Sequence, residues 1–171
     1  MYYYGTMRVP AVALAFLVAI ATPALAFAEP YAVGSTLPEI ELPDQHGAAR
    51  TIDASVKAVV FSRDMKAGEV VKAAVEQGGA DLFDRNGAVY VVDVQGMPAI
   101  IRALFAMPAM RRRPYKLLVD EEGVKTADIP GGATHPTVLV LDELKVTAIS
   151  HPASAEELIA AIQPPPPAKE P

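Results

Sequence analysis

The chain has 171 residues, of which 51% are hydrophobic and 20% are charged, and its net charge is −5 at pH 7. This composition is sufficient to bury a core, and the negative charge argues against nucleic-acid binding, which needs a positive surface. Cysteine is absent, which excludes disulfides, thiolate nucleophiles, Cys-ligated zinc, iron–sulfur clusters and thioether-linked haem within this chain.

Both ends are predicted to lie outside the folded domain. Residues 1–28 have the pattern of a secretory signal peptide, because Arg8 precedes an apolar run over residues 9–21 and small-residue cleavage sites follow. We expect cleavage after Ala28 and a periplasmic or extracellular location; the alternative is an uncleaved N-terminal membrane anchor. Residues 164–171 are rich in proline and are expected to form an extended, disordered tail.

The middle of the chain alternates between predicted strands and helices. Short apolar runs rich in β-branched residues predict strands. These strands are expected at residues 57–62, 88–94, 115–119, 137–141 and 145–149, with a weak extended segment at 124–129 and short strands near Ile40 and Thr51. The order implies one α/β domain over residues 29–163, with a mixed central sheet and helices on both faces.

Two of the predicted helices have clear end signals. Asp64 is the candidate N-cap of a helix over residues 67–76, which Gly78 and Gly79 would end. Ser154 and Glu157 have the spacing of a capping box at the start of the last helix.

A further helix is predicted to begin after Pro98, a residue that suits a first helical turn. Its apolar positions are expected to face the core, and Pro108 is expected to end it. Those apolar positions are Ile100, Ile101, Leu104 and Phe105.

The segment over residues 33–47 resembles the opening of peroxiredoxins and thiol-specific antioxidant proteins. That opening typically runs G-x-x-x-P-x-x-x-L-x-D-x-x-G, and the matching positions here are Gly34, Pro38, Leu42, Asp44 and Gly47. The order of elements is also that of the thioredoxin-like superfamily, so the resemblance covers most of residues 33–162 and implies a thioredoxin-like fold.

A second part of the resemblance is His135-Pro136-Thr137, which precedes an apolar strand. It is similar to the loop that faces the active site in thioredoxin folds, whose proline is usually cis. Arg113-Pro114-Tyr115 offers a second register for this loop. The hairpin and helix that follow Pro136 favour the first register.

The chain departs from the family where the chemistry takes place. Active members carry a cysteine at the junction of the first buried strand and its helix, which here reads Ser62-Arg63-Asp64-Met65-Lys66. Neither a serine hydroxyl nor a thioether replaces the thiolate in peroxide reduction or disulfide exchange. We therefore predict no peroxidase, reductase or isomerase activity for this cysteine-free member.

The candidate binding face is this junction together with the proline loop, and it comprises Arg63, Asp64, Met65, His135, Pro136 and Thr137. A helix N-terminus beside an arginine suits a small anion or the carboxylate of a partner. The alternative is that Asp64 caps the helix itself and Arg63 is a solvated neighbour. His135 is either a ligand contact or a loop histidine without a role.

A dense basic cluster is formed by Arg111, Arg112, Arg113 and Lys116. It is interpreted either as a solvated turn or as a contact for an acidic protein, an anionic polymer or phospholipid headgroups, where four cations bias an encounter without anchoring the protein. Met97, Met107 and Met110 are interpreted as core filling rather than as copper(I) ligands. We expect no metal site and no cofactor.

Two hypotheses for function follow. The first is a non-enzymatic binding or scaffold module that holds an envelope protein or peptide at the candidate face and has no catalytic residue. The alternative is a cysteine-independent enzyme with Asp64 and His135 as an acid–base pair, which needs both groups within about 3 Å of one reacting atom. A structural envelope protein is a third reading, and the oligomeric state is open.

Overall fold

The computed structural model describes residues 29–131 and 134–163. The predicted signal peptide (1–28) and proline-rich tail (164–171) lie outside the described residues, so both stay predictions. In the part of the chain that the structure describes, no helix has the length and apolar character to cross a bilayer.

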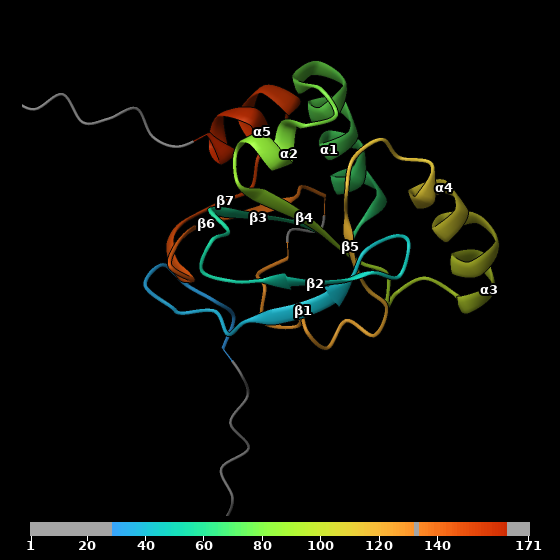
Figure 1. The fold of residues 1–171 in the computed structure, drawn as a ribbon, viewed down its shortest axis with the longest axis horizontal. Helices are drawn as coiled ribbons and strands as arrows, with labels where there is room; N and C mark the ends of the chain where they lie inside the picture. The colour runs from blue at the N-terminus through green and yellow to red at the C-terminus, as the bar shows by residue number, and fades with distance from the viewer. Residues whose placement is uncertain (1–28, 132–133, 164–171) are drawn as a thin grey trace, which may run out of the picture.

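A mixed five-stranded sheet of order β5-β4-β3-β6-β7 forms the centre of the molecule (Figure 1). Strands β3, β4 and β5 run parallel to one another, and β6 and β7 are added antiparallel. Their bounds are β3 (Ala58–Ser62), β4 (Ala88–Asp93), β5 (Leu118–Asp120), β6 (Thr137–Asp142) and β7 (Lys145–Ser150). The predicted strands are therefore confirmed, although β5 is shorter than its apolar run and lies further along the chain.

A separate two-stranded hairpin, β1 (Ile40–Pro43) and β2 (Ala49–Ile52), confirms the short strands expected in the lead-in. Its turn is built by the motif that resembles the peroxiredoxin opening. Asp44 Oδ1 accepts hydrogen bonds from the backbone N–H groups of His46 at 2.8 Å and Ala48 at 2.9 Å. Gly47 has a φ of 88°, which a glycine adopts without strain.

The helices begin and end largely where the capping signals predict. Asp64 caps α1 (Met65–Gly78), and Ser154 caps α5 (Ala155–Ile162) through a hydrogen bond from the Glu157 backbone N–H at 3.2 Å. A short helix, α2 (Leu82–Arg85), lies between α1 and β4. The segment after β4 is one helical run of three parts, α3 (Ala99–Ile101), η1 (Arg102–Ala106) and α4 (Met107–Arg111), of which η1 is π-helical.

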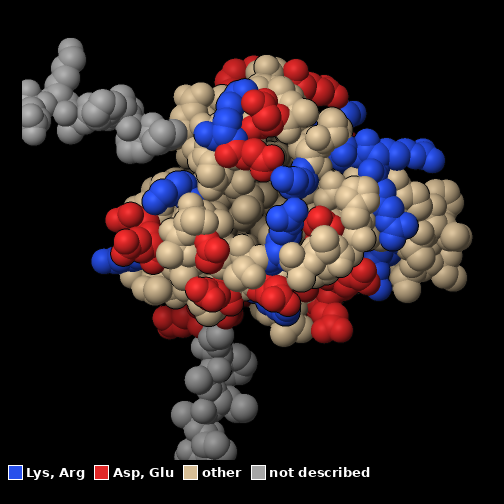
Figure 2. Space-filling view, viewed as in Figure 1, with Lys and Arg blue, Asp and Glu red and all other residues tan. Residues whose placement is uncertain are grey.

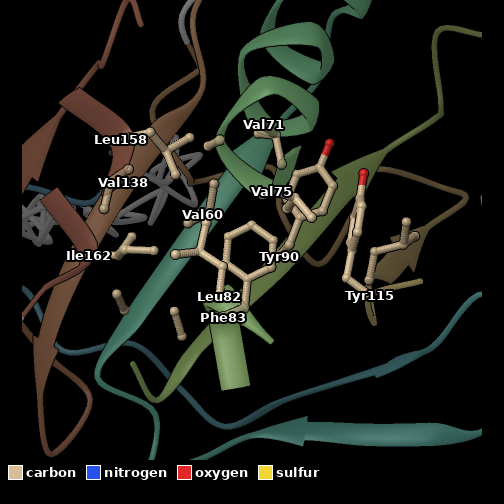
Figure 3. Packing of buried hydrophobic residues seen from close by; sticks show 14 of the residues in the cluster. Val60, Val71, Val75, Leu82, Phe83, Tyr90, Tyr115, Val138, Leu158 and Ile162 are labelled. Atoms are coloured by element: carbon tan, nitrogen blue, oxygen red, sulfur yellow. The ribbon is translucent and has the colours of Figure 1, made fainter. Parts of the chain in front are cut away.

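The two faces of the sheet carry separate core clusters, because successive side chains of a strand point to opposite faces. Val60 of β3 packs with Val71 of α1 and Leu158 of α5 on the face that the helices cover (Figure 3). Its neighbours Val59 and Phe61 belong to the second cluster, to which β1, β2 and the loop after β5 contribute. The expected mixed sheet flanked by helices is confirmed. In finer detail, α1 and α5 pack on one face, and the second cluster draws none of its side chains from a helix.

The helix after Pro98 differs from its prediction in two ways. Pro108 does not end it but lies inside the continuous run, directly after the π-helical part η1, in which the regular α-helical hydrogen bonding is already interrupted. Its four apolar residues, Ile100, Ile101, Leu104 and Phe105, are exposed rather than buried. The reason is the orientation of the helix: Met107 and Met110 are the side chains that pack against the core cluster, and Arg102 bonds to Glu121.

The extended segment expected at residues 124–129 is also wrong, since this region forms turns. The buried Asp120 carboxylate accepts hydrogen bonds from the backbone N–H groups of Gly123 at 3.0 Å and Thr126 at 2.9 Å, and from the Thr126 hydroxyl at 3.0 Å. These bonds bend the chain back on itself and place Ile129 in the second core cluster.

Candidate functional site

The candidate site lies at the edge of the sheet where β3 and β4 end. Ser62 and Val92 are Cα partners in the parallel pair, so the residues that follow them, Arg63 and Asp93, stand side by side. Arg63 Nε donates to Asp93 Oδ2 at 2.7 Å. The Asp93 side chain is 2% exposed and that of Arg63 is 43% exposed, so the ion pair joins a buried anion to a half-exposed cation.

Arg63 is held from several sides. Its guanidinium carbon lies 5.2 Å from the centre of the Phe61 ring, and Nη2 is 3.4 Å from the carbonyl oxygen of Thr126. A Cβ added to Gly131 would lie 3.1 Å from Arg63 Nη1, so the loop passes close to the guanidinium. Arg63 is thus partly solvated, and its guanidinium is also oriented by Asp93, an aromatic ring and a loop.

Asp64 and Met65 complete the junction. Asp64 Oδ1 accepts a hydrogen bond from the Lys66 backbone N–H at 2.8 Å, which confirms the expected N-cap and satisfies one donor of the helix end. Met65, the first residue of α1, is 79% exposed. The junction therefore presents an exposed thioether beside a fixed cation.

Beneath the junction, Ser62 and Tyr90 share a buried hydrogen bond of 2.7 Å between their hydroxyl oxygens. Burial raises the pKa of Tyr90 to about 12, even though the Ser62 hydroxyl opposes the shift. Both hydroxyls are thus neutral at physiological pH and are engaged with each other, which gives Ser62 a structural role.

A cavity of about 190 Å³ opens beside Arg63, between the start of α1, the end of β4 and the segment around α4. Typical small-molecule sites measure roughly 300–1,000 Å³, so this cavity suits one side chain of a partner. Its walls combine thioethers with charged groups. The lining includes Met65, Gly68, Met97, Met110, Arg63, Asp64, Glu69 and Arg113.

The proline loop reaches the same edge of the sheet but not the cavity. Thr137 is the Cα partner of Phe61, which places the loop next to β3, whereas Pro114 precedes the edge strand β5. The favoured register at Pro136 thus lies beside the junction. The bond between His135 and Pro136 is trans, as are all peptide bonds of the described residues, so the cis proline that the resemblance implies is corrected.

Side chains of the loop are occupied locally. The Thr137 hydroxyl donates to the carbonyl oxygen of Pro130 and lies 3.1 Å from Nδ1 of His151. His135 Nδ1 lies 3.1 Å from the Thr134 hydroxyl. The structure therefore adds His151 to this neighbourhood, because β7 runs beside β6 and ends there.

The four residues of the basic cluster have four different surroundings. Arg113 lines the cavity and donates to the Tyr115 hydroxyl at 2.8 Å, and Arg111 donates to the carbonyl oxygen of Gln45 at 3.2 Å. Lys116 lies 3.7 Å from an Asp84 carboxylate oxygen, and Arg112 is exposed. Only one of the four predicted cations thus belongs to the candidate site.

Sequence reasoning did not identify Asp93, Tyr90, Met110 or Arg113 as members of the site. The sequence carries a signal for Asp93. Arg63 directly follows the buried run at 57–62, and Asp93 lies at the end of the buried run at 88–94, so a parallel pairing of the two runs brings opposite charges together. Met110 and Arg113 carry no such signal, because only the packing of α4 brings them to the cavity. Among the described residues, no group of three or more His, Cys, Asp or Glu side chains is placed to hold a metal.

No family model and no curated protein matches the chain by sequence. Solved structures resemble it in fold. Peroxidoxin BcpB from Mycobacterium tuberculosis is 25% identical with a TM-score of 0.50, over 76% of this chain and 95% of its own. The protein assigned as thiol:disulfide interchange protein DsbE in Chlorobium tepidum is 16% identical with a TM-score of 0.51, over 77% of this chain and 98% of its own.

A peroxiredoxin-like protein from Aquifex aeolicus is 12% identical with a TM-score of 0.50, over 78% of this chain and 86% of its own. These neighbours resemble the chain over about three quarters of its length. The chain therefore has the thioredoxin-like α/β fold of peroxiredoxins and thiol–disulfide proteins, and it carries no cysteine with which to perform thiol chemistry.

Proposed function

We propose that the chain is a binding module without a catalytic residue, and that it holds an envelope protein or peptide at the junction around Arg63 and Met65. The observation that carries this proposal is the cavity of about 190 Å³ beside the oriented Arg63–Asp93 pair. A fold that otherwise places a thiolate at this junction here places a fixed cation and an exposed thioether.

The lining of the cavity indicates the chemistry of the partner. Met65, Met97 and Met110 offer flexible, polarisable walls that adapt to an inserted apolar side chain. Arg63 and Arg113 lie on the same walls and suit a carboxylate next to that side chain. We infer a partner segment with an apolar residue beside an aspartate, a glutamate or a chain terminus.

The acid–base alternative has no observation in its favour. Asp64 Oδ1 is already an acceptor for the Lys66 N–H, and His135 contacts Thr134. Export, which would bring the module to envelope partners, belongs to this proposal and depends on the predicted signal peptide at residues 1–28.

The test is affinity capture with the chain that begins at Glu29, using an envelope extract of the source organism, followed by affinity measurement with the purified partner. One variant removes polar groups of the face: Arg63→Ala, Asp64→Ala and His135→Ala together. Because losing Arg63 leaves the buried Asp93 unpaired, a second variant, Gly68→Leu, fills the cavity and keeps the ion pair. An added Cβ at Gly68 meets only the Tyr90 hydroxyl oxygen, at 3.9 Å.

Lys72→Leu is the matched control, since it places the same side chain one turn further along α1 and outside the cavity lining. We expect the wild type and the control to retain the partner, and both site variants to lose it. The proposal fails when no partner is retained or when all four proteins retain it equally.

A further inference from the structure

The helical run α3–η1–α4 carries most of the large hydrophobic side chains that are exposed in the described residues. Among all the described residues, seven large hydrophobic side chains are exposed, and four of the seven belong to this run. These four are Ile100 at 71%, Leu104 at 64%, Phe105 at 64% and Ile101 at 45% exposure. Positions i, i+1, i+4 and i+5 of a helix lie on one side of it, so the four form a continuous ridge.

The orientation of this run is fixed by contacts on its other side. Met107 and Met110 pack against the core cluster under α1. Arg102 Nε lies 3.5 Å from a Glu121 carboxylate oxygen, and Nη1 donates to the Glu121 carbonyl oxygen at 3.3 Å. The polar residue thus faces the protein and the apolar residues face outward, the reverse of an ordinary surface helix.

Charge is distributed unevenly around this ridge. Of the chain's 15 Lys and Arg residues, five lie between residues 94 and 119, and none of its 20 Asp and Glu residues does. Figure 2 shows the corresponding side of the molecule as tan surface edged by blue side chains, with the red side chains concentrated over other parts of this view. The segment that carries the ridge therefore supplies cations and no acidic residue of its own, and Glu121 of the following turn pairs with Arg102.

We propose that this region docks on an anionic lipid bilayer, with the ridge in the interface and Arg111 and Arg112 at the level of the headgroups. The run projects from the side of the sheet as a convex element (Figure 1), the shape that a flat interface accepts. An amphipathic helix with Leu and Phe on one face and arginine beside it is suited to that position. Such a membrane repels a protein of net negative charge, and the cations of this segment, which has no acidic residue of its own, oppose that repulsion locally.

Docking on lipid goes beyond binding at the cavity and uses a different surface. Met110 and Arg113 line the cavity from one side of this segment, whereas the ridge lies on the exposed side. A docked chain would therefore keep the junction around Arg63 available to its protein partner.

The test is flotation with vesicles of phosphatidylcholine alone and of phosphatidylcholine with 30% phosphatidylglycerol. The chain is used from Glu29 onward, because residues 1–28 are apolar and would bind lipid themselves; the buried core residues of the described chain lie between Leu37 and Ile162. Circular dichroism checks that each variant is folded. One variant carries Leu104→Ser and Phe105→Ser, and its control carries Val33→Ser and Val124→Ser at exposed apolar sites elsewhere.

A second pair of variants tests the charges. Arg111→Gln with Arg112→Gln removes two cations beside the ridge, and Lys57→Gln with Lys145→Gln removes two exposed cations elsewhere. Each arginine at an anionic surface contributes roughly a fivefold gain in binding, so the first pair should weaken it by at least about tenfold. Added salt should weaken binding of the wild type as well.

We expect the wild type and both control variants to float with anionic vesicles only, and both ridge-region variants to stay behind. The proposal is overturned if the wild type does not float, or if the controls lose binding as strongly as the ridge variants. It is also overturned if sedimentation shows a self-associated species that Leu104→Ser and Phe105→Ser dissociate without any lipid binding, because the ridge would then be covered by a second copy or another protein.

Discussion

Helices α1 and α5 bury their apolar residues in the core, whereas the α3–η1–α4 run leaves four large apolar residues exposed. In α1 the buried positions are Ala67, Val71, Ala74 and Val75, and charged residues occupy the outer face. In α3–η1–α4 the bulkiest apolar residues face outward and Arg102 faces Glu121. Apolar spacing of the same kind thus locates both helices, but only tertiary contacts decide which side of each one is covered.

The largest expected effect compares the same substitution in both regions. Leu158→Ala in α5 removes a side chain that is 0% exposed and leaves a cavity in the core. We expect the free energy of unfolding to fall by about 2–5 kcal/mol. Leu104→Ala, at 64% exposure, should change it by less than about 0.5 kcal/mol.

Urea unfolding followed by far-UV circular dichroism measures both values, which suits a chain without tryptophan. A loss above about 2 kcal/mol for Leu104→Ala would mean that the ridge is covered within the protein itself. In that case the contrast between the two regions, and the lipid proposal with it, would be abandoned.

The second prediction concerns Tyr90, which lies in the cluster under α1. An unfolded tyrosine loses its proton near pH 10, whereas the pKa of Tyr90 in the folded chain is about 12. Between these values the unfolded state binds fewer protons, so the free energy of unfolding should fall by about 2 kcal/mol as the pH rises from 10 to 12. Tyr90→Phe should remove most of this slope.

Urea titrations at pH 9, 10, 11 and 12 provide the measurement. Tyr115→Phe is the comparison variant, since burial also raises the pKa of Tyr115 but that side chain is less enclosed. It should flatten the slope less than Tyr90→Phe does. Equal slopes in the wild type and Tyr90→Phe would show that this hydroxyl is not held neutral by the core.

The third prediction tests the turn that supports the outward-facing run. Asp120→Ala removes the acceptor for Gly123 and Thr126 and leaves buried donors unpaired. We expect a loss of about 2 kcal/mol in the free energy of unfolding. Glu122→Ala, an exposed acidic residue of the same turn, should stay within about 0.5 kcal/mol of the wild type. Equal effects of the two substitutions would contradict the role assigned to Asp120.

Much of the fold could be predicted from local chemistry. Asp64 and Ser154 are capping residues whose partners lie two or three positions away, and the buried run at 57–62 needs only its own side chains to indicate a strand. The extended segment predicted at 124–129 is wrong because the structure of this segment depends on the Asp120 carboxylate. That carboxylate accepts the hydrogen bond of the Thr126 backbone N–H, which in a strand would go to a neighbouring strand.

The site could be predicted only in part, for the same physical reason. The resemblance pointed to the junction at Arg63, and the pairing of Phe61 in β3 with Thr137 in β6 brings the proline loop to the same edge of the sheet. The contact between Arg63 and Asp93 joins residues 30 positions apart and requires the parallel alignment of β3 with β4. Met110 and Arg113 reach the cavity through the packing of α4, which their own sequence neighbourhood does not encode.

The smallest expected effect is that of the ion pair between Arg102 and Glu121, whose side chains are 22% and 50% exposed. A double-mutant cycle with Arg102→Ala and Glu121→Ala should give a coupling energy of about 0.2–1 kcal/mol, because water screens a pair at this exposure. Met107 and Met110 would then contribute more to holding the helix than the ion pair does. A coupling energy above about 2 kcal/mol would mean that the ion pair contributes more to holding the helix than the two methionines do. The outward position of the ridge would then depend on one charge contact, and Glu121→Ala alone should release the helix and abolish lipid docking.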